Sequence, residues 1–132
     1  NLNMRDVVNM AAMVEMEAVF AEEQPRIAGV FLKRVEIGMP IQSDTTIQYI
    51  LGAQKETITF KDTEIDNPYN TYQNFGLPPG PIGSPSLSAI QAVLEPEQTD
   101  YLYFVAQNDG HHRFSRTYAE HLRAIDEIYY GR

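Results

Sequence analysis

Two glutamates, Glu15 and Glu17, lie inside the mostly apolar stretch DVVNMAAMVEMEAVF (residues 6–20). In a helix, the residues one turn from Glu15 would all be small or apolar: Ala11, Ala12, Ala18 and Val19. Burying a charged carboxylate is costly, so such a group either finds a partner or has a raised pKa. A carboxyl that stays protonated near neutral pH can act as a general acid. The alternative is an ordinary core helix with its acids at the rim.

Gln42, Ser43 and Asp44 form a polar cluster directly ahead of a short apolar run. Asp44 is predicted to cap a helix over residues 45–51, which Gly52 would end. Capping alone would account for an acid at this position, so a structural role and a functional role both stay open.

Residues 66–86 contain five prolines and three glycines without any period, a composition typical of a surface linker. Apolar anchors are nevertheless interleaved through the segment: Tyr69, Tyr72, Phe75, Leu77 and Ile82. A linker is usually poor in such residues, so we expect an ordered loop that forms the wall of a binding site. Its aromatic and amide side chains suit a sugar better than a small anion.

Capping residues and apolar spacing predict the remaining elements. These are a helix from Pro25 to Gly38, a strand at 57–60, a helix from Ser86 to Leu94, a strand at 101–105, a turn at 108–110, a returning strand at 112–115, and a last helix opened by Thr117–Glu120 and closed by Gly131. The order indicates an α+β fold with a small, largely antiparallel sheet packed with helices, in one domain over residues 1–132.

Composition narrows the class of function. The 132 residues carry a net charge of −8, which argues against a nucleic-acid surface because phosphates attract clustered Lys and Arg. The absence of cysteine excludes disulfides and leaves the redox compartment open. No run approaches the roughly 20 apolar residues that span a bilayer.

The sequence predicts no metal site and no cofactor. There is no phosphate loop, dinucleotide fingerprint or metal-ligand spacing. His111 and His112 are adjacent, so on a strand they would point to opposite faces and could not hold one ion together.

Four blocks of the sequence resemble the catalytic domain of the endolytic murein transglycosylases, the YceG-like family of bacterial cell-envelope proteins. They are AAMVEMEA (11–18), RIAGVFLKRVEIGMPIQSDTTIQY (26–49), DNPYNTYQNFGLPPGPIGSPSLSAIQA (66–92) and TDYLYFVAQNDGHHRFSRTYAEHLRAI (99–125). They cover almost the whole chain in the family's order. The pair YNTY and GLPPGPI is long and compositionally unusual, which makes a chance match implausible.

The resemblance implies which residues carry the activity. The first acid of the family's V-E-x-E motif is the catalytic residue, which falls on Glu15, while Glu17 is a possible secondary acid with no assigned role. Asp44 would stabilise positive charge at the sugar ring or orient a hydroxyl. The expected substrate-binding residues are Gln42, Ser43, Asp44, Tyr69, Asn70, Thr71, Tyr72, Leu77, Pro78, Ile82, His112 and Phe114.

The resemblance also implies the reaction. The enzyme would cut the β-1,4 bond between N-acetylmuramic acid (MurNAc) and N-acetylglucosamine (GlcNAc) within peptidoglycan strands and leave a 1,6-anhydromuramoyl end. The substrate's own C6 hydroxyl would be the nucleophile, so one carboxyl could first donate and then retake a proton. The expected role is to end the elongation of nascent strands, with peptidoglycan synthases (penicillin-binding proteins) as possible partners.

Two departures from the family bear on these expectations. The family commonly has proline where this chain has Thr45, in the sequence Gln42-Ser43-Asp44-Thr45-Thr46, which leaves the position of Asp44 less constrained. Family members also carry a membrane anchor and a LysM-like glycan-binding subdomain ahead of the catalytic part. Neither lies in this chain, so we expect a catalytic fragment of an envelope protein that acts outside the cytoplasmic membrane.

Two other functions remain as alternatives. The same groove could bind peptidoglycan strands without cutting them. A lyase with a pyridoxal cofactor, a label given to some relatives, would need a Schiff-base lysine. The three lysines, Lys33, Lys55 and Lys61, lie in charged or exposed surroundings by sequence, which disfavours this reading.

Overall fold

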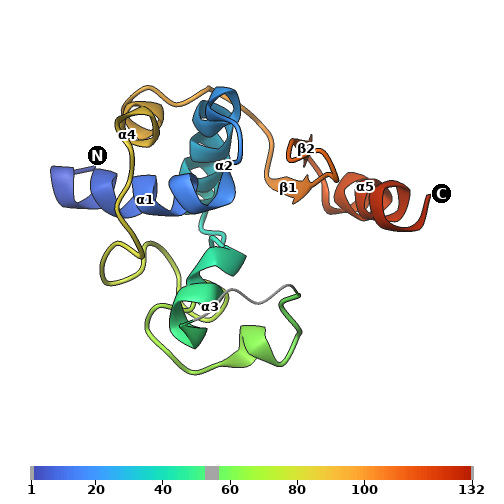
Figure 1. The fold of residues 1–132 in the computed structure, drawn as a ribbon, viewed down its shortest axis with the longest axis horizontal. Coiled ribbons are helices and arrows are strands. Elements are labelled where there is room, and N and C mark those ends of the chain that lie inside the picture. The colour runs from blue at the N-terminus through green and yellow to red at the C-terminus, as the bar shows by residue number, and fades with distance from the viewer. Residues whose placement is uncertain (1, 53–56, 132) are drawn as a thin grey trace.

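The computed structural model describes residues 2–52 and 57–131. A helical core of α1 (Met4–Glu17), α2 (Gln24–Ile37) and α4 (Leu87–Leu94) forms one side of the molecule (Figure 1). Helix α3 (Asp44–Leu51) and the long loop over residues 66–86 lie below this core in the view of Figure 1. The β-hairpin (residues 103–115) and α5 (Tyr118–Tyr130) extend to the other side. The two ends of the chain lie at opposite ends of this arrangement (Figure 1). The site described below lies where these three parts meet.

Helix α1, Met4–Glu17, crosses the core. Asn3 caps its start by accepting a hydrogen bond from the Asp6 amide at 2.9 Å. The helix ends at Glu17, because Ala18 is already extended (φ −88°, ψ 126°). It therefore begins two residues before the predicted stretch and ends three residues before it does, and Glu17 becomes its last residue.

Helix α2, Gln24–Ile37, follows a short 3₁₀ turn, η1 (Ala21–Glu23). Proline lies in the first turn, where its missing amide costs no hydrogen bond, and Gly38 ends the helix in the left-handed conformation (φ 81°). Helix α4, Leu87–Leu94, begins where the Ser86 side chain accepts a hydrogen bond from the Ala89 amide. These predicted boundaries are confirmed to within a residue.

The three helices enclose one apolar core. Its members have almost no exposed surface: Val7, Met10, Ala11, Ala12, Met13, Val14, Ile27, Ala28, Phe31, Ile41, Ile82, Ala89, Ala92 and Val93. Small side chains on α1 let α4 approach closely, so the alanines that surround Glu15 in the sequence serve helix packing.

Helix α3, Asp44–Leu51, begins after Ser43 and ends at Gly52 (φ 74°). Neither Ser43 nor Asp44 caps it through a side chain, so the predicted Asp44 cap is wrong and its carboxylate is available for other contacts. The predicted strand at 57–60 is also wrong. Thr59 and Asp62 instead exchange side-chain-to-backbone hydrogen bonds that form a turn into the 3₁₀ helix η2 (Asp62–Glu64).

Strands β1 (Tyr103–Ala106) and β2 (His112–Ser115) form a two-stranded antiparallel sheet in which Phe104 pairs with Phe114 and Ala106 with His112. A capping box formed by Thr117 and Glu120 opens α5 (Tyr118–Tyr130), as predicted. The fold is α+β with a small antiparallel sheet, which confirms the predicted class. Among the described residues, no helix is long and apolar enough to cross a membrane.

Candidate active site

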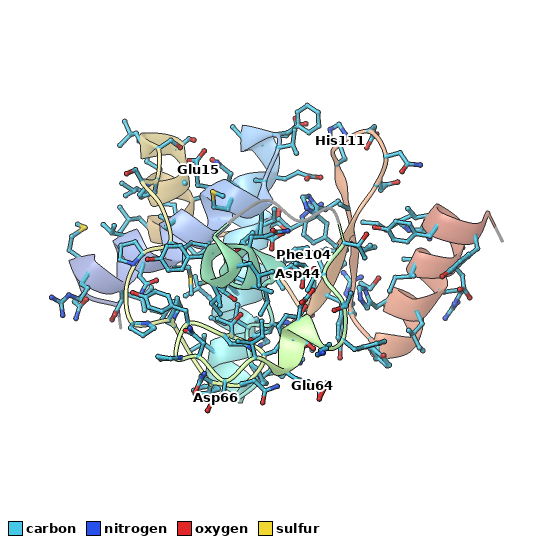
Figure 2. The ribbon with its side chains drawn as sticks, turned by 60° about the horizontal axis from the view of Figure 1, so that its bottom comes forward. Glu15, Asp44, Glu64, Asp66, Phe104 and His111 are labelled. Atoms are coloured by element: carbon cyan, nitrogen blue, oxygen red, sulfur yellow. The ribbon has the colours of Figure 1, made fainter. Side chains whose placement is uncertain are left out.

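A cleft of about 380 Å³ lies between the end of α1, the start of α3, the long loop, the hairpin and α5. Asp44 and Phe104, which both line the cleft, are labelled near the middle of Figure 2, whereas Glu15 is labelled at the upper left, beside α4. Its lining residues are Glu17, Arg34, Ile41, Gln42, Asp44, Tyr72, Tyr103, Phe104, Val105, Ala106, His112, Tyr118, His121, Ile125 and Tyr129.

Glu17 projects into this cleft from the last turn of α1. Its Oε1 accepts a hydrogen bond of 2.8 Å from the Ser43 hydroxyl. Burial raises the pKa of Glu17, and the nearby negative charge of Asp44 raises it further, although the Ser43 hydrogen bond and His112 partly oppose this effect. The position at a helix C-terminus also disfavours a negative charge. Glu17 is therefore an acid that holds its proton to higher pH than an ordinary glutamate.

Asp44 lies across the same cleft and accepts a hydrogen bond from the Tyr72 hydroxyl. The residue is exposed overall, but the protein around its carboxylate raises the pKa of Asp44, and the bond from Tyr72 opposes that rise. The same burial and the adjacent carboxylate raise the pKa of Tyr72, which stays a neutral donor. The cleft thus holds two carboxyl groups in different surroundings.

His112 connects the cleft to the turn that follows α1. Its side chain is only 4% exposed, and its Nδ1 lies 2.8 Å from a carboxylate oxygen of Glu23. The His112 amide also donates to both oxygens of Glu23. This contact fixes β2 against η1, and so keeps the hairpin wall of the cleft in place relative to Glu17.

A hydrogen-bonded layer beneath the cleft positions Ser43. The Ser43 amide donates to Thr71 Oγ1 at 2.9 Å, and the Thr71 and Thr46 hydroxyls lie 2.9 Å apart. All three residues are buried, at 2% exposure or less. Asn70 is also fully buried: its side-chain nitrogen donates to the backbone oxygens of residues 63 and 65, and its oxygen accepts from the Tyr72 amide.

This layer changes the role expected for the YNTY segment. Asn70 and Thr71 have no exposed side-chain surface with which to contact a sugar, and they hold Tyr72 and Ser43 in position instead. The prediction that residues 66–86 are ordered is confirmed by these bonds and by the anchor between the Asn9 side chain and the Pro78 carbonyl at 2.7 Å. Of this segment, Tyr72 alone lines the cleft, so its role as the wall of a binding site stays a prediction.

Gln42 has an unusual backbone at the edge of the cleft. It is the only non-glycine residue with positive φ (53°) in the described part of the chain. Its amide donates to the Thr71 carbonyl at 3.2 Å, which helps to hold this conformation. Strained backbone of this kind occurs where a site requires it, and here it directs the chain from α2 to Ser43 and Asp44.

Glu15 has a different environment from the predicted one. It is partly exposed on the side of α1 that faces the start of α4, and its carboxylate accepts a 2.8 Å hydrogen bond from the Ser86 amide. That contact lowers the pKa of Glu15, so the group is ionised at neutral pH. The expectation of a buried, protonated carboxyl at Glu15 is wrong, because the residue is partly exposed and the Ser86 amide stabilises its charged form.

The structure brings Gln42, Asp44, Tyr72 and His112 of the predicted set together with Glu17 around the cleft. Five others do not line it. Four of these belong to the core or pack against it, namely Tyr69, Leu77, Ile82 and Phe114, and the fifth, Pro78, is buried and accepts a hydrogen bond from Asn9. Sequence reasoning missed Arg34, Tyr103 and His121. Arg34 carried one signal, since it is a cation on the apolar side of a helix, but its contacts come from segments far away in the chain.

Two other features of the structure bear on the chemistry. Among the described residues, no group of three or more His, Cys, Asp or Glu side chains could hold a metal ion. A larger hollow of about 610 Å³ lies on another side of α2, next to residues 96–101. It is lined by charged side chains, several of them ion-paired, such as Arg26 with Glu97 at 2.7 Å.

An acid with a raised pKa, a second carboxylate and tyrosines in one cleft are groups that carbohydrate-cleaving enzymes use. The sequence profile of the YceG-like family matches residues 1–127. The chain therefore belongs to the YceG-like family.

Curated relatives and a solved structure agree with this membership. A Bacillus subtilis (strain 168) protein named endolytic murein transglycosylase is 42% identical over 126 residues, covering 96% of this chain and 35% of the relative. A protein of the same name from Streptococcus pneumoniae (strain D39) is 38% identical over 133 residues, covering 96% of this chain and 24% of the relative. The crystal structure of a YceG-like protein from Listeria monocytogenes is similar with a TM-score of 0.83 and 44% identity, over 88% of this chain and 38% of that one.

The chain thus spans between 24% and 38% of the length of these relatives.

Proposed function

We propose that this chain is the catalytic part of a peptidoglycan lytic transglycosylase and that Glu17, not Glu15, is its general acid. The observation that carries the assignment is the position of Glu17 on the cleft, with a pKa raised by burial. The names of the relatives support the substrate class. Two residues away on the same helix, Glu15 is ionised and lies outside the cleft.

The proposed reaction uses Glu17 twice. As a neutral acid it donates its proton to the glycosidic oxygen between C1 of MurNAc and O4 of GlcNAc, and the C1–O4 bond breaks with O4 leaving as a hydroxyl. The C6 hydroxyl of the same MurNAc then attacks C1, and its proton returns to the Glu17 carboxylate. The products are a 1,6-anhydro end and a GlcNAc end, without consumption of water. Acid–base catalysis of this kind contributes about 10²–10⁴ in rate.

The other groups on the cleft fit supporting roles. In its ionised form, Asp44 stabilises the positive charge that develops at C1, and the hydrogen bond from the Tyr72 hydroxyl favours that form and keeps the carboxylate oriented. Ser43 donates to Glu17 and fixes the direction of its carboxyl. The aromatic side chains of Tyr72, Tyr103 and Phe104 offer apolar faces on which sugar rings stack.

One observation favours a second candidate, a hydrolase that cuts the same bond. Because Asp44 faces the same cleft as Glu17, it could activate a water, as the second carboxylate of an ordinary glycosidase does. A glycan-binding module without cleavage is the third candidate. A pyridoxal lyase is disfavoured, because neither Lys33 nor Lys61 lines the cleft; Lys55 lies outside the described residues.

Digestion of purified peptidoglycan, followed by mass spectrometry of the product ends, separates these candidates. We expect muropeptides whose MurNAc ends are one water lighter than hydrolytic products. Ordinary reducing ends would identify the hydrolase, and retention of strands without release would identify the binding module.

The proposed setting follows from the substrate. Glycan strands lie outside the cytoplasmic membrane, so we propose a role at the cell envelope, in ending the elongation of nascent strands. Peptidoglycan synthases are the proposed protein partners. Co-purification of the full-length protein with a synthase would test that partnership independently of the chemistry.

A further inference from the structure

Arg34 is a buried cation at the back of the cleft. Only 7% of the residue is exposed. Its Nε donates to the Leu102 carbonyl at 2.7 Å, and its Nη1 donates to the Pro40 carbonyl at 2.9 Å and, with longer bonds, to the Ile41 carbonyl and the Gln42 side chain. These bonds hold the guanidinium in one orientation on the lining of the cleft.

The charge of Arg34 is not neutralised within the described part of the chain. All of its hydrogen-bond partners are neutral oxygens, and none of the ion pairs includes it. Nη2 makes no hydrogen bond to the described residues, although the other guanidinium nitrogens do. Burial lowers the pKa of Arg34, but arginine remains charged at any physiological pH. A buried cation of this kind is stabilised when a ligand supplies the missing anion.

The neighbours of Arg34 complete a pocket for such a ligand. The guanidinium carbon lies 5.2 Å from the centre of the Tyr103 ring, and the His121 ring stacks on Tyr103 with centroids 5.1 Å apart. His121 Nδ1 is buried and has no hydrogen-bond partner among the described residues. Burial and the charge of Arg34 lower the pKa of His121, so the ring is neutral at neutral pH and can donate one hydrogen bond.

We propose that Arg34, Tyr103 and His121 form a subsite that binds a carboxylate on the MurNAc side of the substrate. Nη2 of Arg34 would donate to one carboxylate oxygen, with the uncommitted nitrogen of His121 close by. The subsite gives the cleft a preference for muramic acid, which bears a lactyl ether, over GlcNAc, which does not. This inference rests on the proposed function for the identity of the saccharide, but not on the occurrence of cleavage.

Binding to the Glu17→Gln variant tests the subsite without turnover. The first probe is a peptide-free glycan strand with free lactyl carboxylates, and its control is the same strand with those groups converted to methylamides. The second probe is a strand with intact stem peptides, compared with the same strand after its peptide carboxylates are amidated. The two pairs separate the lactyl group from the peptide as the source of the carboxylate.

We expect one of the two charged strands to bind about tenfold more tightly than its amidated control, the gain typical of a charge-assisted hydrogen bond in a desolvated site. Adding Arg34→Gln should reduce that preference to less than about twofold, while binding of the amidated strand changes little. Equal binding of charged and amidated strands in both pairs would overturn the proposal, as would a preference that survives Arg34→Gln. The comparison of strands needs no Arg34 variant, so it is decisive even if Arg34→Gln does not fold.

The outcome is independent of catalysis. If the chain shows the preference but releases no products in the digestion, the proposed function fails and the subsite stands. If it releases anhydro products and shows no preference, the subsite fails and the function stands.

Discussion

Glu15 and Glu17 lie two residues apart on one helix, yet their carboxyl groups differ in pKa because their surroundings differ. Glu15 accepts a backbone amide hydrogen bond at a partly exposed position, which favours its charged form. Glu17 is desolvated and faces a second carboxylate, which favours its neutral form. A general acid must keep its proton, so of these two glutamates Glu17 has the environment that such a role requires.

The raised pKa of Glu17 predicts a pH-dependent stability. A carboxyl with a raised folded-state pKa favours folding while it is protonated, and that contribution is lost as pH rises through the folded-state pKa. We therefore expect Glu17→Gln to unfold at a higher temperature than the wild type at about pH 8. The difference should disappear below the ordinary value of 4.5, where both side chains are neutral.

Thermal unfolding followed by circular dichroism over this pH range measures the effect. Glu15→Gln is the matched control, and it should show no gain at high pH, because its pKa is lowered and its charged form is the favoured one. Identical pH profiles for the two variants would contradict the burial of Glu17.

Tyr72 predicts a shift in the pH dependence of activity. Its hydroxyl lowers the pKa of Asp44, which must be ionised to stabilise positive charge, so activity is lost as pH falls through the pKa of Asp44. Tyr72→Phe should move this acid limb to higher pH and reduce the rate at its optimum by about tenfold, the scale of one hydrogen bond to a charged group. Initial rates of product release across pH measure it. Tyr49→Phe is the control: Tyr49 lies on α3, as Asp44 does, but outside the cleft, so this change should alter neither the acid limb nor the rate.

At the scale of single residues, the sequence predicted which helix carries the candidate acids, but it could not show which of the two faces the cleft. The alanines around Glu15 indicated a water-poor face, and that face is indeed packed, but α4 occupies it. Glu17 gains its environment from Ser43, Asp44 and His112, which come from distant segments. Family resemblance likewise pointed to the first acid.

The elements were more predictable, because their signals are local. Proline at the start of α2, glycine at its end and the capping box of α5 each act within a few residues. The strand predicted at 57–60 failed because the Thr59 and Asp62 side chains bond to the backbone in place of a neighbouring strand. The apolar residues of the long loop predicted its order correctly. Tyr69, Leu77 and Ile82 anchor the loop to the core, however, Phe75 is exposed, and of these five residues Tyr72 alone lines the cleft.

Gly29 lies where α2 and the segment before β1 approach each other closely. A Cβ at this position on α2 would lie 2.4 Å from the Glu97 carbonyl oxygen and 3.1 Å from Thr99 Cγ2. Gly to Ala within a helix normally stabilises it by about 1 kcal/mol, but here the backbone contact must open. We expect Gly29→Ala to lower the free energy of unfolding by about 1–3 kcal/mol.

Urea denaturation measures this change, with Glu36→Ala on the exposed part of the same helix as the control. A stabilised Gly29→Ala variant would show that α2 and the segment before β1 are not in close contact.

The cleft exists only at the scale of the whole molecule. Helix α1 supplies Glu17, the chain before and within α3 supplies Ser43 and Asp44, the loop supplies Tyr72, and the hairpin and α5 close the other side. Composition and periodicity could not place these segments against one another. The order of the elements predicted the fold class, and the long resemblance to the YceG-like family predicted the substrate class. The proposed reaction therefore depends on one catalytic acid, Glu17, at the meeting point of all these segments.

Release of anhydromuropeptides by the matched pair Glu17→Gln and Glu15→Gln tests that claim most directly. Both variants replace a carboxylate by an amide of the same shape, and mass spectrometry of digested peptidoglycan counts anhydro ends for each against the wild type. We predict that Glu17→Gln loses at least about 100-fold in rate, the contribution of an acid–base group, while Glu15→Gln stays within about threefold of wild type. Near-normal release by Glu17→Gln together with loss of activity in Glu15→Gln would contradict the account.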